Sequence, residues 1–133
     1  MGLSLALAGT LWTFTQQREQ ERQLIFTGNQ YRQAIGNYYQ RTPGSVKTYP
    51  NTLKDLLQDN RYVSTQRYLR KLYQDPITQS LDWGLVMAPQ GGIMGVYSSS
   101  KRRPIKSEGF KQANTNFTYQ KEYSGWQFLY VEK

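Results

Sequence analysis

No proline occurs before Pro43, and the first fourteen residues, MGLSLALAGTLWTF, contain no charged side chain. Arg18 is the first ionised side chain in the sequence. A stretch of this kind favours one long helix whose N-terminal part avoids water. Fourteen helical residues span about 21 Å, whereas the apolar core of a bilayer is about 30 Å thick and takes about 20 residues. The uncharged segment as written is therefore too short to cross a membrane comfortably.

Three interpretations of the apolar segment are open: a cleaved signal peptide, a helix buried in its own domain, and the remainder of a longer apolar helix. A secretory signal places basic residues ahead of its apolar stretch, and no basic residue precedes Leu3. The polar helical pattern that follows favours the third interpretation. We expect residues 1–17 to belong to a transmembrane or assembly helix. Its contacts would be made by Leu3, Leu5, Leu7, Leu11, Trp12 and Phe14.

Residues 18–40 continue the helical pattern as an amphipathic segment. The steps along its apolar face alternate between four and three residues, which describes one side of a helix. The residues on this face, predicted to pack on a sheet, are Leu24, Gly28, Tyr31, Ile35 and Tyr38. Gly28 and Gly36 lower helix propensity, which predicts close packing against them. Arg18 and Glu21 are expected to form a solvent-exposed i,i+3 pair. The helix should end near Gln40, before Thr42-Pro43-Gly44.

Residues 41–133 have the composition of a single globular domain. Thr52 is placed to cap a short helix with Leu56 on its buried face, and residues 61–74 carry a second short apolar face of the kind found on helices. Two strands, residues 81–87 and 93–97, flank the turn Pro89 to Gly92 and predict a hairpin. The C-terminal WQFLYVE predicts a third strand. One long helix followed by an antiparallel meander is an α+β fold.

The chain contains no cysteine and no histidine, and its net charge is +8 from 17 basic and 9 acidic residues. These absences exclude thiol and histidine catalysis, disulfides, and zinc ligation by cysteine or histidine. No catalytic constellation stands out, so we predict a protein that is not an enzyme and has no cofactor. The positive charge favours anionic partners or neighbouring subunits. Candidate contact residues are Arg61, Arg67, Arg70, Lys71, Lys101, Arg102, Arg103 and Lys106.

An ordered set of short motifs runs through the chain: Tyr49-Pro50, Tyr68-Leu69, Asp75-Pro76, Asp82-Trp83-Gly84, Gly95-Val96-Tyr97-Ser98 and Tyr123-Ser124-Gly125-Trp126. In this order, and over almost the whole chain, the sequence resembles the pseudopilins of bacterial type II secretion systems, in particular those related to the major subunit. The resemblance implies a pilin-like fold, with a long N-terminal helix packed on a small antiparallel sheet. It also implies a single-pass inner-membrane protein with a periplasmic domain. Such a subunit assembles with its own copies, with other pseudopilins and with the secretion machinery.

The sequence departs from the family pattern at two places. The basic leader, its processing site and the helix glutamate of the family are not present, so we interpret the chain as truncated upstream. Family members often bind calcium in the loop before the last strand, but residues 98–123 contain only Glu108 and Glu122 as acids. Because a calcium ion usually takes several oxygen ligands and more than one carboxylate, we expect no calcium site of that kind.

Two other functions stay open at this point. A minor pilin of a DNA-uptake or type IV pilus system would contact DNA through the basic loops, where basic residues and tyrosines occur together, although tyrosine is too widespread in this chain to favour nucleic acid. A membrane-tethered periplasmic adaptor would share the anchor but would not polymerise.

Overall fold

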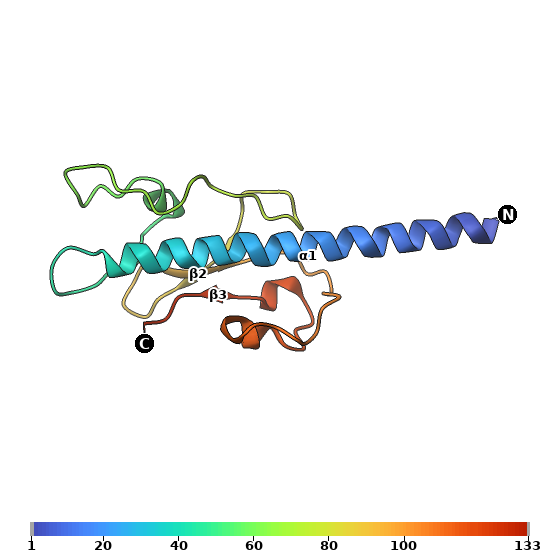
Figure 1. Ribbon diagram of the computed structural model, residues 1–133. Coiled ribbons are helices and arrows are strands. Elements are labelled where there is room, and N and C mark those ends of the chain that lie inside the picture. The colour runs from blue at the N-terminus through green and yellow to red at the C-terminus, as the bar shows by residue number, and fades with distance from the viewer. Residues whose placement is uncertain (1, 133) are drawn as a thin grey trace.

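The longest element is the helix α1, Gly2–Gln40, in a computed structural model that describes residues 2–132 and their side chains from Leu11 onward. Its 39 residues give a length of about 58 Å. The N-terminal part of α1 extends well beyond the rest of the molecule, and the remaining elements gather around its C-terminal half (Figure 1). The single long helix expected from the missing prolines is confirmed.

Helix α1 ends where Thr42 turns back on it. The Thr42 hydroxyl donates to the carbonyl of Tyr39 at 2.8 Å and accepts the N–H of Thr48 at 3.2 Å. A side chain that binds one of the last carbonyls of a helix satisfies an acceptor that the helix itself leaves open. Pro43 follows and cannot continue the hydrogen-bond pattern. The predicted end near Gln40 is confirmed.

The sheet has three antiparallel strands in the order β1 (Gly84–Met87), β2 (Ile93–Tyr97) and β3 (Phe128–Leu129). Gly91 and Gly92 in the hairpin turn have φ angles of 100° and 86°, a region that glycine occupies without strain. The predicted hairpin and third strand are confirmed, but β1 and β3 are shorter than their apolar patterns suggested. A register shift between Val86 and Met87 interrupts the first pair.

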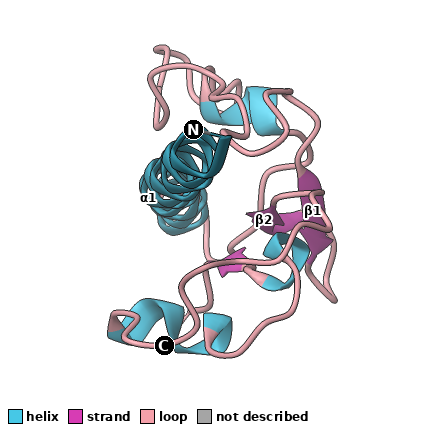
Figure 2. Ribbon diagram, turned by 90° about the vertical axis from the view of Figure 1, so that its right-hand side faces the viewer, coloured by secondary structure: helices cyan, strands magenta, loops and turns pink. Residues whose placement is uncertain are grey.

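Helix α1 packs across β2 and β3 (Figure 2). Gly28 makes this approach close, because a Cβ atom there would lie 2.4 Å from the ring of Phe128. Gly36 allows a second close approach, because a Cβ atom there would lie 2.7 Å from the ring of Tyr130. The molecule is therefore an α+β fold of one long helix on a small sheet.

Short 3₁₀-helices lie in the connections: η1 (Leu53–Leu56), η2 (Gln112–Phe117) and η3 (Tyr123–Gly125). The carboxylate of Asp55 accepts the N–H of Thr52 at the start of η1, and Leu56 is fully buried. Rings of the C-terminal half pack into one cluster in which Phe117 stacks on Trp126 at 5.4 Å between ring centroids. This cluster joins the long connection between β2 and β3 to the core that α1 and the sheet share.

The helix expected from the second apolar face, within residues 61–74, is wrong: this segment is irregular. The N–H groups of Tyr68 and Leu69 both donate to the carbonyl of Leu56, and Asp59 pairs with Gln66 in an isolated bridge. Backbone groups bound to another segment cannot form the hydrogen bonds of a helix. Leu69 is still buried, but it reaches the core from a loop that is tied to η1.

Candidate functional site

The projecting part of α1 carries large apolar side chains that touch no core. Leu11, Trp12 and Phe14 have exposed fractions of 67%, 70% and 48%. Leu3, Leu5 and Leu7 lie outside the residues whose side chains are described. Within residues 2–132, no helix combines the length and apolar character needed to cross a membrane. Clustered exposed apolar residues of this size mark a surface that meets a partner or a lipid.

Further along α1, the face toward the sheet is fully packed. Leu24, Tyr31 and Ile35 are completely buried, and Tyr38 is 7% exposed. The Tyr31 hydroxyl donates to the carbonyl of Tyr73 at 2.9 Å and accepts the N–H of the same residue at 2.8 Å. Burial raises the pKa of Tyr31 to about 12. These side chains hold the helix on the domain and leave none of their own surface for a partner.

Glu21 was expected on the solvent side of α1, paired with Arg18, and this expectation is wrong. Glu21 is only 3% exposed. Its carboxylate accepts the backbone N–H groups of Ile105 and Lys106 and the hydroxyl of Tyr123. A carboxylate with several hydrogen-bond donors tolerates burial. The steps of three and four residues from position 21 to 24 and 28 continue the packing face back to Glu21. This spacing could have predicted from the sequence that Glu21 is buried.

Gln17, one turn earlier on α1, extends the same contact. Its side-chain amide donates to the carbonyl of Arg103 and to the hydroxyl of Tyr123, both at 2.9 Å. Burial, with a further contribution from the carboxylate of Glu21, raises the pKa of Tyr123. The loop after β2 is therefore fastened to the helix just where the exposed apolar part of α1 begins. We name Gln17, Glu21 and Tyr123 the loop clasp.

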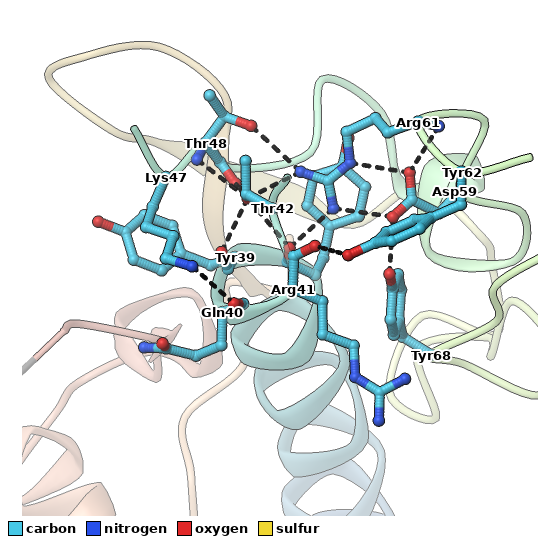
Figure 3. Close-up of polar contacts among 11 residues, drawn as sticks. Tyr39, Gln40, Arg41, Thr42, Lys47, Thr48, Asp59, Arg61, Tyr62 and Tyr68 are labelled. Atoms are coloured by element: carbon cyan, nitrogen blue, oxygen red, sulfur yellow. Dashed lines mark hydrogen bonds and ion pairs between the residues drawn. The ribbon is translucent and has the colours of Figure 1, made fainter. Parts of the chain in front are cut away.

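Arg61 was a candidate for contacts with anions or other subunits, but the structure directs it inward. Its guanidinium forms an ion pair with the buried carboxylate of Asp59 at 2.8 Å and donates to the carbonyl of Tyr38 at 2.8 Å and to the hydroxyl of Thr42 (Figure 3). It also lies 3.6 Å from the centroid of the Tyr38 ring. A cation at the carboxyl end of a helix stabilises it. Arg61 thus binds and stabilises the carboxyl end of α1.

The same network controls the charge of Asp59. Burial by itself raises the pKa of this carboxyl, but hydrogen bonds from Arg61 and Tyr68 outweigh burial and bring the pKa to about 2. Burial and the bond to Asp59 raise the pKa of the Tyr68 hydroxyl to about 12. Asp59 is therefore ionised and Tyr68 is protonated at neutral pH.

The other predicted basic residues divide between two regions. Arg67, Arg70 and Lys71 belong to the irregular segment before β1, whereas Lys101, Arg102, Arg103 and Lys106 belong to the loop after β2. These two segments lie on opposite sides of α1 (Figures 1 and 2). Lys101 pairs with Glu122 at 3.4 Å, and Lys106 lies over the ring of Phe110. The two groups do not form one continuous basic surface.

Comparison with known proteins found no matching family model, and neither the curated proteins nor the solved structures gave a significant match. The resemblance to pseudopilins therefore stays a prediction from the sequence.

Within residues 2–132, no group of three or more acidic side chains is close enough to hold a metal ion. In the loop where calcium was considered, Glu108 accepts the hydroxyl of Tyr119, and Glu122 accepts the hydroxyl of Ser124. The bond from Ser124, aided by Lys101, lowers the pKa of Glu122. The loop clasp binds this loop to α1 through Glu21, which accepts the N–H groups of Ile105 and Lys106 and the hydroxyl of Tyr123.

Proposed function

We propose that the protein is a structural subunit of a pilin-like filament, of the kind that type II secretion systems assemble as pseudopili. The exposed apolar part of α1 carries the proposal. A helix about 58 Å long has one half bound to its own domain, whereas Leu11, Trp12 and Phe14 in the other half are exposed. Helix–helix packing between copies would bury that half, with the domain on the outside.

Before assembly, the exposed apolar part of α1 would contact the lipid of a membrane. The first fourteen residues are uncharged, and a tip of this kind favours the acyl region of a bilayer. We infer that the subunit waits in the bacterial inner membrane with its domain in the periplasm. Extraction would then exchange lipid contacts of Leu11, Trp12 and Phe14 for contacts with α1 of other copies. The loop clasp supports this arrangement, because it holds the domain at a fixed position along the helix.

Cysteine crosslinking along α1 tests the proposal. The chain has no cysteine, so every disulfide would come from an introduced residue. Pairs such as Leu11→Cys with Thr15→Cys, in the full chain expressed in a bacterial membrane, should give a ladder of multimers on mild oxidation. A membrane-tethered adaptor would stop at dimers. Monomers alone at every pair of positions would reject the filament.

A further inference from the structure

Arg32 on α1 is a partly buried cation that forms no ion pair with any other residue among 2–132. Its guanidinium donates to the side-chain carbonyl of Asn29 at 3.0 Å and lies 5.5 Å from the centroid of the Phe128 ring. Its Nε atom is buried without a hydrogen-bond acceptor, and no ion pair between described residues includes it. A guanidinium offers five donors and binds carboxylates in preference to other groups. Arg32 therefore lacks the partner that its chemistry favours.

A groove opens beside Arg32, between α1 and the chain that follows β3. Its lining is rich in hydrogen-bond donors and contains no acidic residue: Arg32, Gln33, Gly36, Asn37, Gln40 and Tyr130. The Tyr130 hydroxyl accepts from the amide of Gln40 at 2.5 Å, and its own hydrogen has no acceptor among the described residues. Because Gly36 has no side chain, the ring of Tyr130 lies against the helix. The groove is suited to a carboxylate with apolar atoms beside it.

Asp82 is the matching acid. Each of the other acidic side chains is bonded within the chain: Glu19, Glu21, Asp55, Asp59, Asp75, Glu108, Glu122 and Glu132. Asp82 is exposed, and its carboxylate has no partner among residues 2–132. It comes just before β1, at the edge of the sheet, and the neighbouring Leu81 and Leu85 are exposed as well.

One copy of the chain cannot bring these two groups together. Gly84 pairs with Tyr97 at one end of β2, whereas Tyr130 donates to the carbonyl of Met94 near the other end. Asp82 and the groove thus lie at opposite edges of the sheet and toward opposite ends of β2. Surfaces that differ in this way join copies head to tail, and such a contact repeats into a ring or, where the rotation does not close, into an open array.

We propose that Asp82 of one copy binds Arg32 of the next, with Leu85 seated in the groove against Gly36 and Tyr130. The contact rests on the proposed filament and specifies which surfaces of the domains meet. Its two halves are complementary in charge, and in a chain with a net charge of +8 Asp82 is the acid that remains for such a contact. The partner is therefore a second copy of this chain.

Crosslinking next to the pair tests the contact without removing it. Gln33→Cys in one full-length copy and Leu81→Cys in a second, size-tagged copy leave Arg32 and Asp82 in place. Mild oxidation of the mixture should give a tagged heterodimer. The matched control replaces Gln33→Cys by Lys121→Cys, which is exposed in a different loop. We expect the heterodimer yield to exceed that control about fivefold, the effect of a partly desolvated ion pair.

Charge reversal shows whether the pair itself is responsible. Arg32→Glu should lower the yield to that of the control, and Asp82→Arg in the tagged copy should restore it. Lys121→Glu makes the same change in charge and should have no effect. If Arg32→Glu impairs folding, Arg32→Gln removes the charge with less disturbance and should lower the yield equally.

A yield equal to the control, or one that Arg32→Glu and Arg32→Gln both leave unchanged, would overturn the contact. Crosslinks along α1 show whether the Asp82 contact alone is wrong or the proposed filament is wrong as well. A ladder from α1 without the heterodimer rejects the Asp82 contact alone. The heterodimer without that ladder rejects the filament and retains a pairing between copies.

Discussion

The hydroxyl of Tyr123 donates to the carboxylate of Glu21 at 2.7 Å across 102 residues of sequence. The contact joins the middle of α1 to the last turn before β3. Because Gln17 donates to the same hydroxyl, Tyr123 is held by two consecutive turns of the helix. The loop after β2 therefore depends on α1 for its position.

Glu21→Ala should destabilise the protein strongly. The change leaves two backbone N–H groups and one hydroxyl without their acceptor, and hydrogen bonds to a charged group contribute about 1.5–3 kcal/mol each, not additively. We expect the free energy of unfolding in urea to fall by about 3 kcal/mol and residues 99–122 to become sensitive to limited proteolysis. Glu19→Ala is the control, since the pair of Glu19 with Arg22 is exposed and should contribute less than about 1 kcal/mol. Equal effects of the two variants would contradict the clasp.

The loss of stability at acid pH should depend on Asp59. Its pKa is about 3.8 in the unfolded chain and about 2 in the folded protein. A lowered folded-state pKa contributes stability that is complete above the unfolded value and is lost as the pH falls through the folded value. Unfolding free energies measured from pH 5 to pH 2 should therefore fall less steeply for Asp59→Asn than for the unchanged protein. Parallel curves for the two proteins would show that Asp59 is not responsible.

Tyr31 should resist ionisation at alkaline pH. Burial raises its pKa from 10.0 to about 12, so its contribution to stability is present below pH 10 and is lost as the pH rises through about 12. Ultraviolet titration of Tyr31→Phe should lack one late-titrating tyrosine, and the protein should lose about 1–2 kcal/mol of stability. Tyr97→Phe is the control, because no hydrogen bond between described residues involves its hydroxyl. Tyr68 and Tyr123, whose pKa values are also raised, should keep titrating late, so a late-titrating fraction of the same size in Tyr31→Phe and in the unchanged protein would contradict the prediction.

Gly28→Ala should destabilise the protein although alanine favours helices. The gain in propensity is about 1 kcal/mol, but the new methyl group would lie 2.4 Å from the ring of Phe128. Overpacking of this kind costs about 1–3 kcal/mol, so the melting temperature should fall or, at best, stay unchanged. Gln33→Ala on the open side of α1 should be nearly neutral. A rise in melting temperature with Gly28→Ala would mean that the sheet moves away at little cost.

Trp12→Ser should weaken membrane association without affecting the fold. Burying a large apolar side chain is favourable by about 1.5–3 kcal/mol, so binding of the full chain to vesicles of phosphatidylethanolamine and phosphatidylglycerol should fall about tenfold or more. The melting temperature should not change, because Trp12 is 70% exposed. Val63→Ser removes an exposed apolar side chain from a loop and should leave vesicle binding unchanged. Equal binding of all three proteins would contradict a membrane role for this part of α1.

Sequence reasoning succeeded for elements whose pattern is local. The spacing of Leu24, Tyr31 and Ile35 specifies a helix face, and Gly91-Gly92 between two apolar runs specifies a hairpin. It failed for the segment that contains Tyr68 and Leu69, where an apolar face of helical spacing is present but the backbone hydrogen bonds go to Leu56. A pattern reports which side chains avoid water, and it does not report which backbone groups compete for a given carbonyl.

The single long helix and the hairpin of β1 and β2 follow from the order of residues, because each depends on neighbours along the chain. The absence of cysteine and histidine follows from composition alone. The roles of the charged residues do not. Glu21 and Arg61 were expected at the surface, and both became buried or partly buried contacts because segments far away in sequence supply their partners, Tyr123 to one and the end of α1 to the other. Burial of a charge is acceptable only where such partners converge, and that convergence exists only once the chain is folded.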